Sequence, residues 1–115
     1  MTHLHVEHMF SPDGKSLIYR LRGVLGESTY SYDFSDDMRK SIKDGPEKVI
    51  LNLEKLEYIT SAGVGVIAAG YTSAQRADKR LMLCCVPPKV RRVLEICGIL
   101  DVVPASDTED EALTA

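Results

Sequence analysis

The sequence lacks a long hydrophobic run, a C-x-x-C motif and a large excess of charge of one sign, and each absence excludes a class of protein. No apolar run approaches the ~20 residues that a membrane-spanning helix needs. Residues 1–5 lack the basic start and apolar core of a signal peptide. The net charge of -3 at pH 7 gives no indication of nucleic acid or an anionic membrane as a partner. We therefore expect a cytoplasmic protein without membrane insertion.

The chain contains three cysteines, Cys84, Cys85 and Cys97. We expect them to be reduced, buried thiols. Cys84 and Cys85 are adjacent within a predicted strand, so their side chains should point to opposite faces and should not pair with each other.

Hydrophobic periodicity predicts strands that alternate with helices within a single domain, residues 1–115. Strands are predicted at residues 4–10, 17–21, 49–53 and 81–86, with a hairpin turn at 11–14 and a short last strand at 99–103. Helices are predicted around Phe34, Met38 and Ile42, from Ser61 to about Asp78, from Pro88 to Gly98, and after a capping-box pattern at residues 106–109. This order predicts an α/β fold with a mostly parallel or mixed sheet of four to five strands and about four helices.

The main candidate site is the stretch from residue 58 to residue 67, between a buried strand and a predicted helix. Ser61 falls where that helix should begin, with its hydroxyl near the first free backbone N–H groups, as a cap would be. Gly63 and Gly65 follow, and each costs roughly 1 kcal/mol of helix propensity relative to alanine. Two explanations stay open for these glycines: close packing of the first turn on the sheet, or a flat surface for a partner.

Two enzymatic explanations fit this stretch poorly. Residues 63–68 match G-x-G-x-x-A, but the first glycine does not directly follow a strand, and no acidic residue stands near residues 85–88 where a dinucleotide site needs one. Ser61 is not in a G-x-S-x-G elbow, because position 59 is isoleucine, and the chain supplies no obvious base for a hydrolase. We therefore expect no catalytic residues and no cofactor.

Two further site types are also not expected. A response-regulator receiver needs a phosphoacceptor aspartate at the end of its central strand, and residues 49–54 contain none. His3, His5 and Glu7 alternate onto one face of the first strand, but three such residues at a chain terminus, without a second cluster, do not make a metal site.

Residues 49–67 resemble the signature of STAS domains, and more narrowly that of bacterial anti-sigma factor antagonists. The family pattern is an apolar strand, a short link, and roughly I-D-S-S/T-G-L-G-V-L at the start of a helix. Gly23 and residues 94–99 are similar to other landmarks of the family. The resemblance covers about residues 4–113 and implies a STAS-like fold for the whole domain.

The resemblance also implies a non-enzymatic phosphoprotein that regulates transcription by partner switching. Such an antagonist binds an anti-sigma factor that is also a GHKL-type serine kinase, and thereby releases a sigma factor. The kinase phosphorylates the serine of the motif, which is Ser61 here, and the antagonist dissociates; a PP2C-type phosphatase reverses the modification. The implied partner-binding residues are Thr60, Ser61, Ala62, Gly63 and Gly65.

Two departures from the family pattern leave alternatives open. Thr60 replaces the aspartate before the serine, which removes a negative charge and adds a second hydroxyl, so Thr60 is an alternative phosphoacceptor. Ala62 replaces the second Ser/Thr of the motif. The alternative function is a stand-alone STAS subunit of a stressosome-type or membrane-transporter complex that works without a phosphorylation switch.

Overall fold

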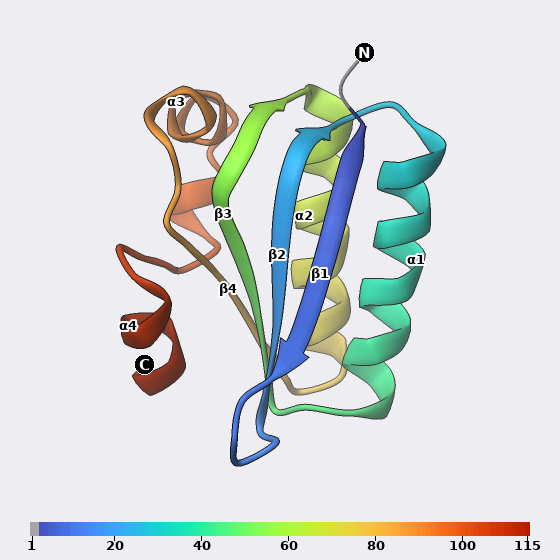
Figure 1. The fold of residues 1–115 in the computed structure, drawn as a ribbon, viewed down its shortest axis with the longest axis vertical. Coiled ribbons are helices and arrows are strands. Elements are labelled where there is room, and N and C mark those ends of the chain that lie inside the picture. Colours follow the sequence, from blue (N-terminus) through green and yellow to red (C-terminus); the bar gives the residue numbers. More distant parts are fainter. Residues whose placement is uncertain (1–2) are drawn as a thin grey trace.

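The computed structural model describes residues 3–115 as a five-stranded mixed sheet with helices on both faces (Figure 1). The strands are β1 (Leu4–Phe10), β2 (Ser16–Leu25), β3 (Lys48–Ile59), β4 (Arg80–Cys84) and β5 (Ala105–Ser106). The helices within this part of the chain are α1 (Thr29–Asp44), α2 (Ser61–Arg76), α3 (Pro88–Ile96) and α4 (Glu109–Thr114), with a 3₁₀ turn at Ile99–Asp101. The predicted α/β fold is therefore confirmed.

The strands follow one another across the sheet in sequence order, β1-β2-β3-β4-β5. β1 is antiparallel to β2, and the three remaining pairs are parallel. The carboxyl ends of β2 and β3 therefore lie at the same end of the sheet, where they lead into α1 and α2. The candidate stretch lies at this end.

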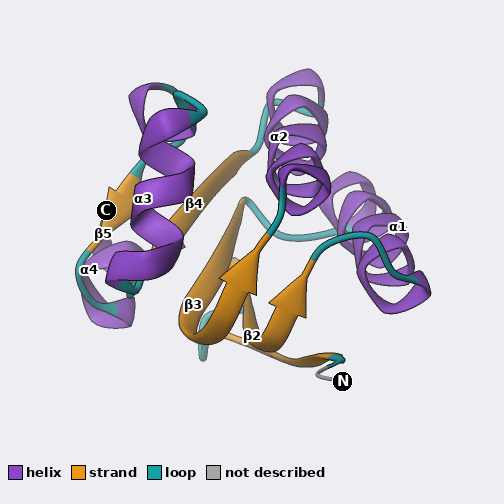
Figure 2. Cartoon of the chain, turned by 90° about the horizontal axis from the view of Figure 1, so that it is seen from above, coloured by secondary structure: helices purple, strands orange, loops and turns teal. Residues whose placement is uncertain are grey.

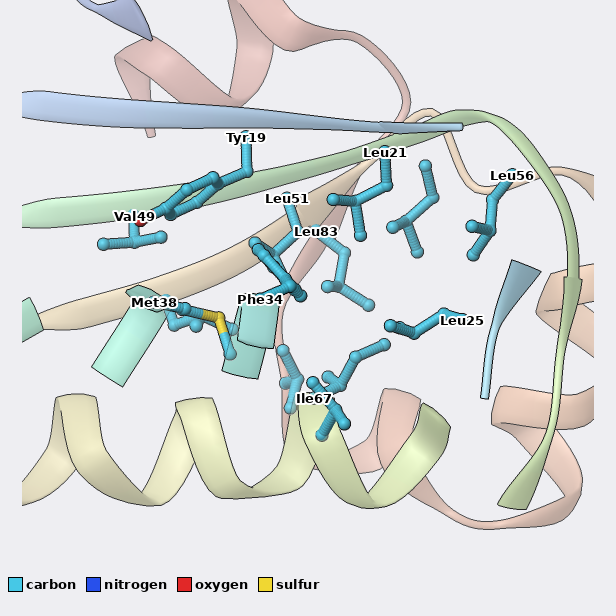
Figure 3. Packing of buried hydrophobic residues seen from close by; sticks show 14 of the residues in the cluster. Tyr19, Leu21, Leu25, Phe34, Met38, Val49, Leu51, Leu56, Ile67 and Leu83 are labelled. Carbon is cyan, nitrogen blue, oxygen red and sulfur yellow. The ribbon is translucent and has the colours of Figure 1, made fainter. Parts of the chain in front are cut away.

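The two faces of the sheet bury two separate apolar clusters, because successive side chains along a strand point to opposite faces. Leu17 and Tyr19 of β2 belong to the main cluster, which α1 and α2 cover on one side of the sheet (Figures 2 and 3). Ile18 belongs to a smaller cluster with Ala112 of α4, which lies on the other side. α3 packs beside the curved end of β3 and adds Leu94 to the main cluster.

The predicted last strand at residues 99–103 is wrong. Ile99–Asp101 forms a 3₁₀ turn after Gly98, whose φ of 74° reverses the chain. The last strand comes later, at Ala105–Ser106, where it pairs with the end of β4. Because Ser106 lies in that strand, the cap of α4 is Thr108, whose hydroxyl oxygen accepts a hydrogen bond from the Glu111 N–H over 3.1 Å.

The prediction for the cysteines is only partly correct. All three are free thiols, but only Cys84 is buried, whereas Cys85 is half-buried and Cys97 is exposed. Cys85 follows the end of β4 with a φ of 58°, and this left-handed conformation breaks the alternation of faces. Both Cys84 and Cys85 consequently pack in the smaller cluster, and they do not point to opposite faces.

Within residues 3–115, no helix has the length and apolar character to cross a membrane. No group of three or more histidine, cysteine, aspartate or glutamate side chains gathers there as a set of metal ligands, and this includes His3, His5 and Glu7.

Candidate functional site

The candidate site lies where β3 ends and α2 begins. Along the β2–β3 pair the register shifts twice, and the second shift leaves Glu57 without a partner between Leu56 and Tyr58. Such bulges bend a strand and change the direction of its side chains. β3 is visibly curved at this end (Figure 1), and Tyr58, three residues before Ser61, is 56% exposed.

Thr60, and not Ser61, caps helix α2. The Thr60 hydroxyl oxygen accepts a hydrogen bond from the Gly63 N–H over 3.3 Å, and its carbonyl oxygen accepts one from the Val64 N–H over 2.9 Å. The Thr60 N–H donates to the Leu25 carbonyl oxygen over 3.1 Å, so Thr60 still pairs with the end of β2. The backbone of Thr60 is therefore extended, and the helix begins at Ser61, one residue earlier than it would with Ser61 as the cap.

Ser61 is the first residue of α2, and its side chain is exposed. The first N–H groups of a helix have no partner within the helix. Thr60 satisfies those of Gly63 and Val64. The N–H groups of Ser61 and Ala62 are thus the ones that an anion at the helix start would meet, where the helix dipole also favours negative charge.

The two glycines that follow Ser61 have different roles. A Cβ at position 63 would overlap the Leu25 carbonyl oxygen and lie 2.8 Å from Ile59 Cγ1, so Gly63 allows α2 to pack on the end of β2. A Cβ at position 65 would meet nothing within 4 Å, and Gly65 is exposed. Close packing therefore explains Gly63, and it does not explain Gly65.

The connection between β2 and α1 also contacts the site, and the sequence did not predict this contact. A Cβ at Gly26 would lie 2.9 Å from Thr60 Oγ1 and 3.0 Å from Thr60 Cγ2. The Gly26 N–H donates to Ser31 Oγ over 3.0 Å, which holds this connection against the first turn of α1. Thr60 is thus enclosed between its own helix and this connection.

No acid or base within residues 58–65 accompanies the Ser61 hydroxyl, since the sequence there is Tyr-Ile-Thr-Ser-Ala-Gly-Val-Gly. The three histidines His3, His5 and His8 lie on or beside β1, which β2 separates from β3. The Glu109 carboxylate, which accepts hydrogen bonds from Arg20 and Asn52, lies at the start of α4 on the other side of the sheet. The site therefore offers a surface and a modifiable hydroxyl.

The comparisons of this chain with known proteins agree on one family. The model of the STAS domain family matches residues 10–112. The anti-sigma F factor antagonist of Paenibacillus polymyxa is 31% identical over 103 residues, which are 85% of this chain and 84% of the relative. BtrV of Bordetella bronchiseptica, whose assignment as an anti-sigma factor antagonist is provisional, is 31% identical over 99 residues, which are 86% of this chain and 84% of the relative.

Solved structures show the same fold at lower sequence identity. An anti-sigma factor antagonist from Mycobacterium paratuberculosis superposes with a TM-score of 0.82 at 18% identity, covering 97% of this chain and 92% of that one. The antagonist SpoIIAA in its unphosphorylated form superposes with a TM-score of 0.75 at 20% identity, covering 96% of each chain. The chain therefore belongs to the STAS domain family and, within it, to the anti-sigma factor antagonists, which are not enzymes.

Proposed function

We propose that this protein acts in the cytoplasm as an anti-sigma factor antagonist whose binding is switched off by phosphorylation of Ser61. Its partner is an anti-sigma factor that is also a GHKL-type serine kinase, so that binding releases a sigma factor, and a PP2C-type phosphatase restores the active form. The observation that carries this proposal is the position of Ser61, which is exposed at the first residue of α2 while its neighbour Thr60 makes the cap.

The same geometry favours Ser61 over Thr60 as the phosphoacceptor. The Thr60 hydroxyl already accepts the Gly63 N–H, and its side chain lies against Gly26. A phosphate on Thr60 would have to displace the connection between β2 and α1. A phosphate on Ser61 requires no such movement, because no cap depends on its hydroxyl.

Phosphorylation of Ser61 should act on the partner and leave the fold unchanged. A phosphate adds a charge of about -1.5 to -2 and three acceptor oxygens. At a helix start these meet free N–H groups and a favourable dipole, worth ~0.3–1 kcal/mol. A partner that packs closely on Ser61, Ala62 and Gly65 has no room for this group, and each ~1.4 kcal/mol of clash or desolvation lowers affinity tenfold.

The direct test is to incubate the protein with the candidate kinase and ATP and to map the phosphate by mass spectrometry. We expect one phosphate, on Ser61, in the wild type and none in Ser61→Ala. Phosphate on Thr60 in the wild type would contradict the assignment of the acceptor. If the kinase modifies neither residue, the stand-alone STAS subunit becomes the better explanation.

Binding to the same kinase tests the switch itself. Ser61→Ala should bind about as tightly as the wild type and stay bound in the presence of ATP, whereas Ser61→Asp should bind at least tenfold more weakly. Thr72→Asp is the matched control, because it places the same charge at an exposed position of the same helix, away from its start. Equal affinities of Ser61→Asp and Thr72→Asp would disprove the switch.

A further inference from the structure

A groove between helices α1 and α2 carries an excess of positive charge, although the net charge of the chain is -3. The two helices lie side by side on one face of the sheet (Figure 2). They run in the same direction, because each follows one of the parallel strands β2 and β3. Their carboxyl-terminal halves line the groove, which we name the basic groove, with four cations and one carboxylate: Arg39, Lys40, Lys43, Arg76 and Asp36.

The chain does not supply counter-charges for most of these cations. The Asp36 carboxylate pairs with the Arg39 guanidinium at 2.9 Å. Within residues 3–115, Lys40, Lys43 and Arg76 make no ion pair, and all three are exposed. Arg39 and Lys43 are four residues apart on α1, and like charges at that spacing destabilise a helix by ~0.2–0.5 kcal/mol. The basic groove therefore contains a repulsion that a bound anion would relieve.

Helix stability explains only part of this charge. The helix dipole favours cations in the last turn of a helix, and its effect falls off beyond that turn. Lys43 and Arg76 are the basic residues in the last turns of α1 and α2. Arg39 and Lys40 lie farther from the end of α1. The dipole thus accounts for two of the four cations, and it does not account for all four lining one groove.

We propose that the basic groove binds an acidic segment of a protein partner, whose carboxylates contact Lys40, Lys43 and Arg76. The axes of packed helices are ~8–10 Å apart, so a single segment of chain between them meets the cations of both helices. Hydrogen bonds from lysine and arginine to carboxylates are charge-assisted, and an arginine can hold one carboxylate with two N–H groups. The partner would supply the counter-charges that this chain lacks.

Other anionic partners fit the groove less well. Asp37, Asp44 and Asp78 are exposed, and each lies within two residues of a cation of the groove. A nucleic-acid duplex is much wider than the groove, so its phosphates would meet these carboxylates as well. An anionic membrane is bound by cations beside exposed apolar side chains. The large hydrophobic side chains that are exposed in the described chain lie outside residues 36–43 and 73–77.

The basic groove lies far from the proposed phosphorylation site. Ser61 and Arg76 are the first and last residues of α2, which places them roughly 22 Å apart at 1.5 Å per residue. At physiological ionic strength the Debye length is only about 8 Å. A phosphate on Ser61 should therefore have little effect on the affinity of the groove, and the inference does not depend on the proposed switch.

Fluorescence anisotropy of a labelled oligoglutamate peptide tests this inference. We expect saturable binding to the wild type, which weakens as salt is added. Lys43→Glu/Arg76→Glu should weaken binding at least about tenfold. The neutral variant Lys43→Gln/Arg76→Gln avoids acidic charge at the helix ends and should weaken binding in the same direction.

Lys89→Glu/Arg92→Glu is the matched control, because it makes the same change of charge at two exposed positions of α3. It should bind the peptide like the wild type. Equal weakening by the two glutamate double variants would overturn the proposal, and so would a wild type that does not bind the peptide up to millimolar concentration.

Backbone amide chemical shifts locate the bound peptide. We expect changes within residues 36–43 and 73–77, and the same changes in Ser61→Asp. Changes confined to α3 would overturn the proposal, and loss of binding in Ser61→Asp would disprove the independence from Ser61. A DNA duplex or phosphatidylserine vesicles that bound the wild type more tightly than the peptide, and lost this binding in Lys43→Glu/Arg76→Glu, would assign the groove to another class of partner and overturn the proposal.

Discussion

Gly63 lies so close to the main-chain carbonyl group of Leu25 that no side chain fits between them. Any Cβ at position 63 would overlap that oxygen and lie 2.8 Å from both the Leu25 carbonyl carbon and Ile59 Cγ1. Two of these atoms belong to the backbone of β2, which cannot move without disturbing its pairing with β3. Helix α2 can therefore occupy its position on the sheet only because residue 63 has no side chain.

We expect Gly63→Ala to lower the free energy of unfolding by about 1–3 kcal/mol, the usual range for overpacking a tightly packed site. Gly65→Ala is the matched variant, because it makes the same change two residues later, where a Cβ meets nothing within 4 Å. It should raise the free energy of unfolding by up to about 1 kcal/mol through helix propensity. Urea denaturation followed by circular dichroism measures both, and a similar loss in the two variants would contradict the packing explanation.

Thr60→Ala should lower the free energy of unfolding by about 0.5–2 kcal/mol, because it removes the oxygen that accepts the Gly63 N–H. Thr60→Ser keeps that oxygen and should recover most of the loss. Ser61→Ala should change stability much less, since Ser61 makes no cap. If thermal unfolding showed Ser61→Ala to be the more damaging of the two alanine variants, the assignment of the cap would be wrong.

The Arg20 guanidinium holds the pKa of Glu109 below its ordinary value, with help from the Asn52 amide, although partial burial acts in the other direction. A carboxylate with a lowered pKa stabilises the fold above its ordinary pKa, and this contribution is lost as the pH falls through the lowered value. At pH 7 Glu109→Gln should therefore cost roughly 1 kcal/mol or less, because Arg20 is 43% exposed and the pair is screened.

Urea denaturation from pH 7 down to pH 3 measures the difference in free energy of unfolding between Glu109→Gln and the wild type. This difference should shrink once the pH falls below about 4.5, the ordinary pKa of a glutamate. Asp110→Asn serves as the control, because Asp110 lies in the same first turn of α4 and is exposed. Its stability difference from the wild type should be small over this pH range. A Glu109→Gln difference that grew on acidification would contradict the role of the Arg20 contact.

Lys48 ties the end of α4 to the start of β3. Its Nζ donates to oxygens of Ala112, Leu113 and Ala115 over 2.6, 3.0 and 3.0 Å. Lys48→Met should leave these oxygens without their donor and lower the free energy of unfolding by about 1–3 kcal/mol. Hydrogen exchange should become faster in α4 than in α2, whereas Lys43→Met, at an exposed position of α1, should change neither helix. Unchanged exchange in α4 of Lys48→Met would show that the smaller cluster holds α4 without Lys48.

Most of the fold could be predicted from local pattern. The apolar run at residues 49–53 and the helical spacing of Phe34, Met38 and Ile42 each reflect burial within one element, and all three helical residues are buried in α1. The short strand β5 could not be found in this way. Its two residues show no periodicity, and they form a strand only because they pair with Leu83 and Cys84 of β4.

The candidate site was located by the pattern of a buried strand followed by a helix start, and the family resemblance gave it a function, but its internal geometry depends on contacts between distant segments. Ser61 was expected to cap α2, and the cap is Thr60 because the Thr60 N–H continues the pairing with Leu25 at the end of β2. Likewise, the local sequence does not distinguish the role of Gly63 from that of Gly65. The two roles differ because the Leu25 carbonyl group lies against Gly63 and not against Gly65. Gly26 was not identified, because its contact with Thr60 exists only in the folded chain.

The unequal edges of the sheet also limit how this fold could be extended by added strands. A fibre grows along a sheet only when each added copy offers a further free edge to the next copy. The edge opposite β1 is β5, whose 2 residues are too few to template another strand. Head-to-tail growth along the sheet should therefore stop at β5, although β1 at the other edge has 7 residues.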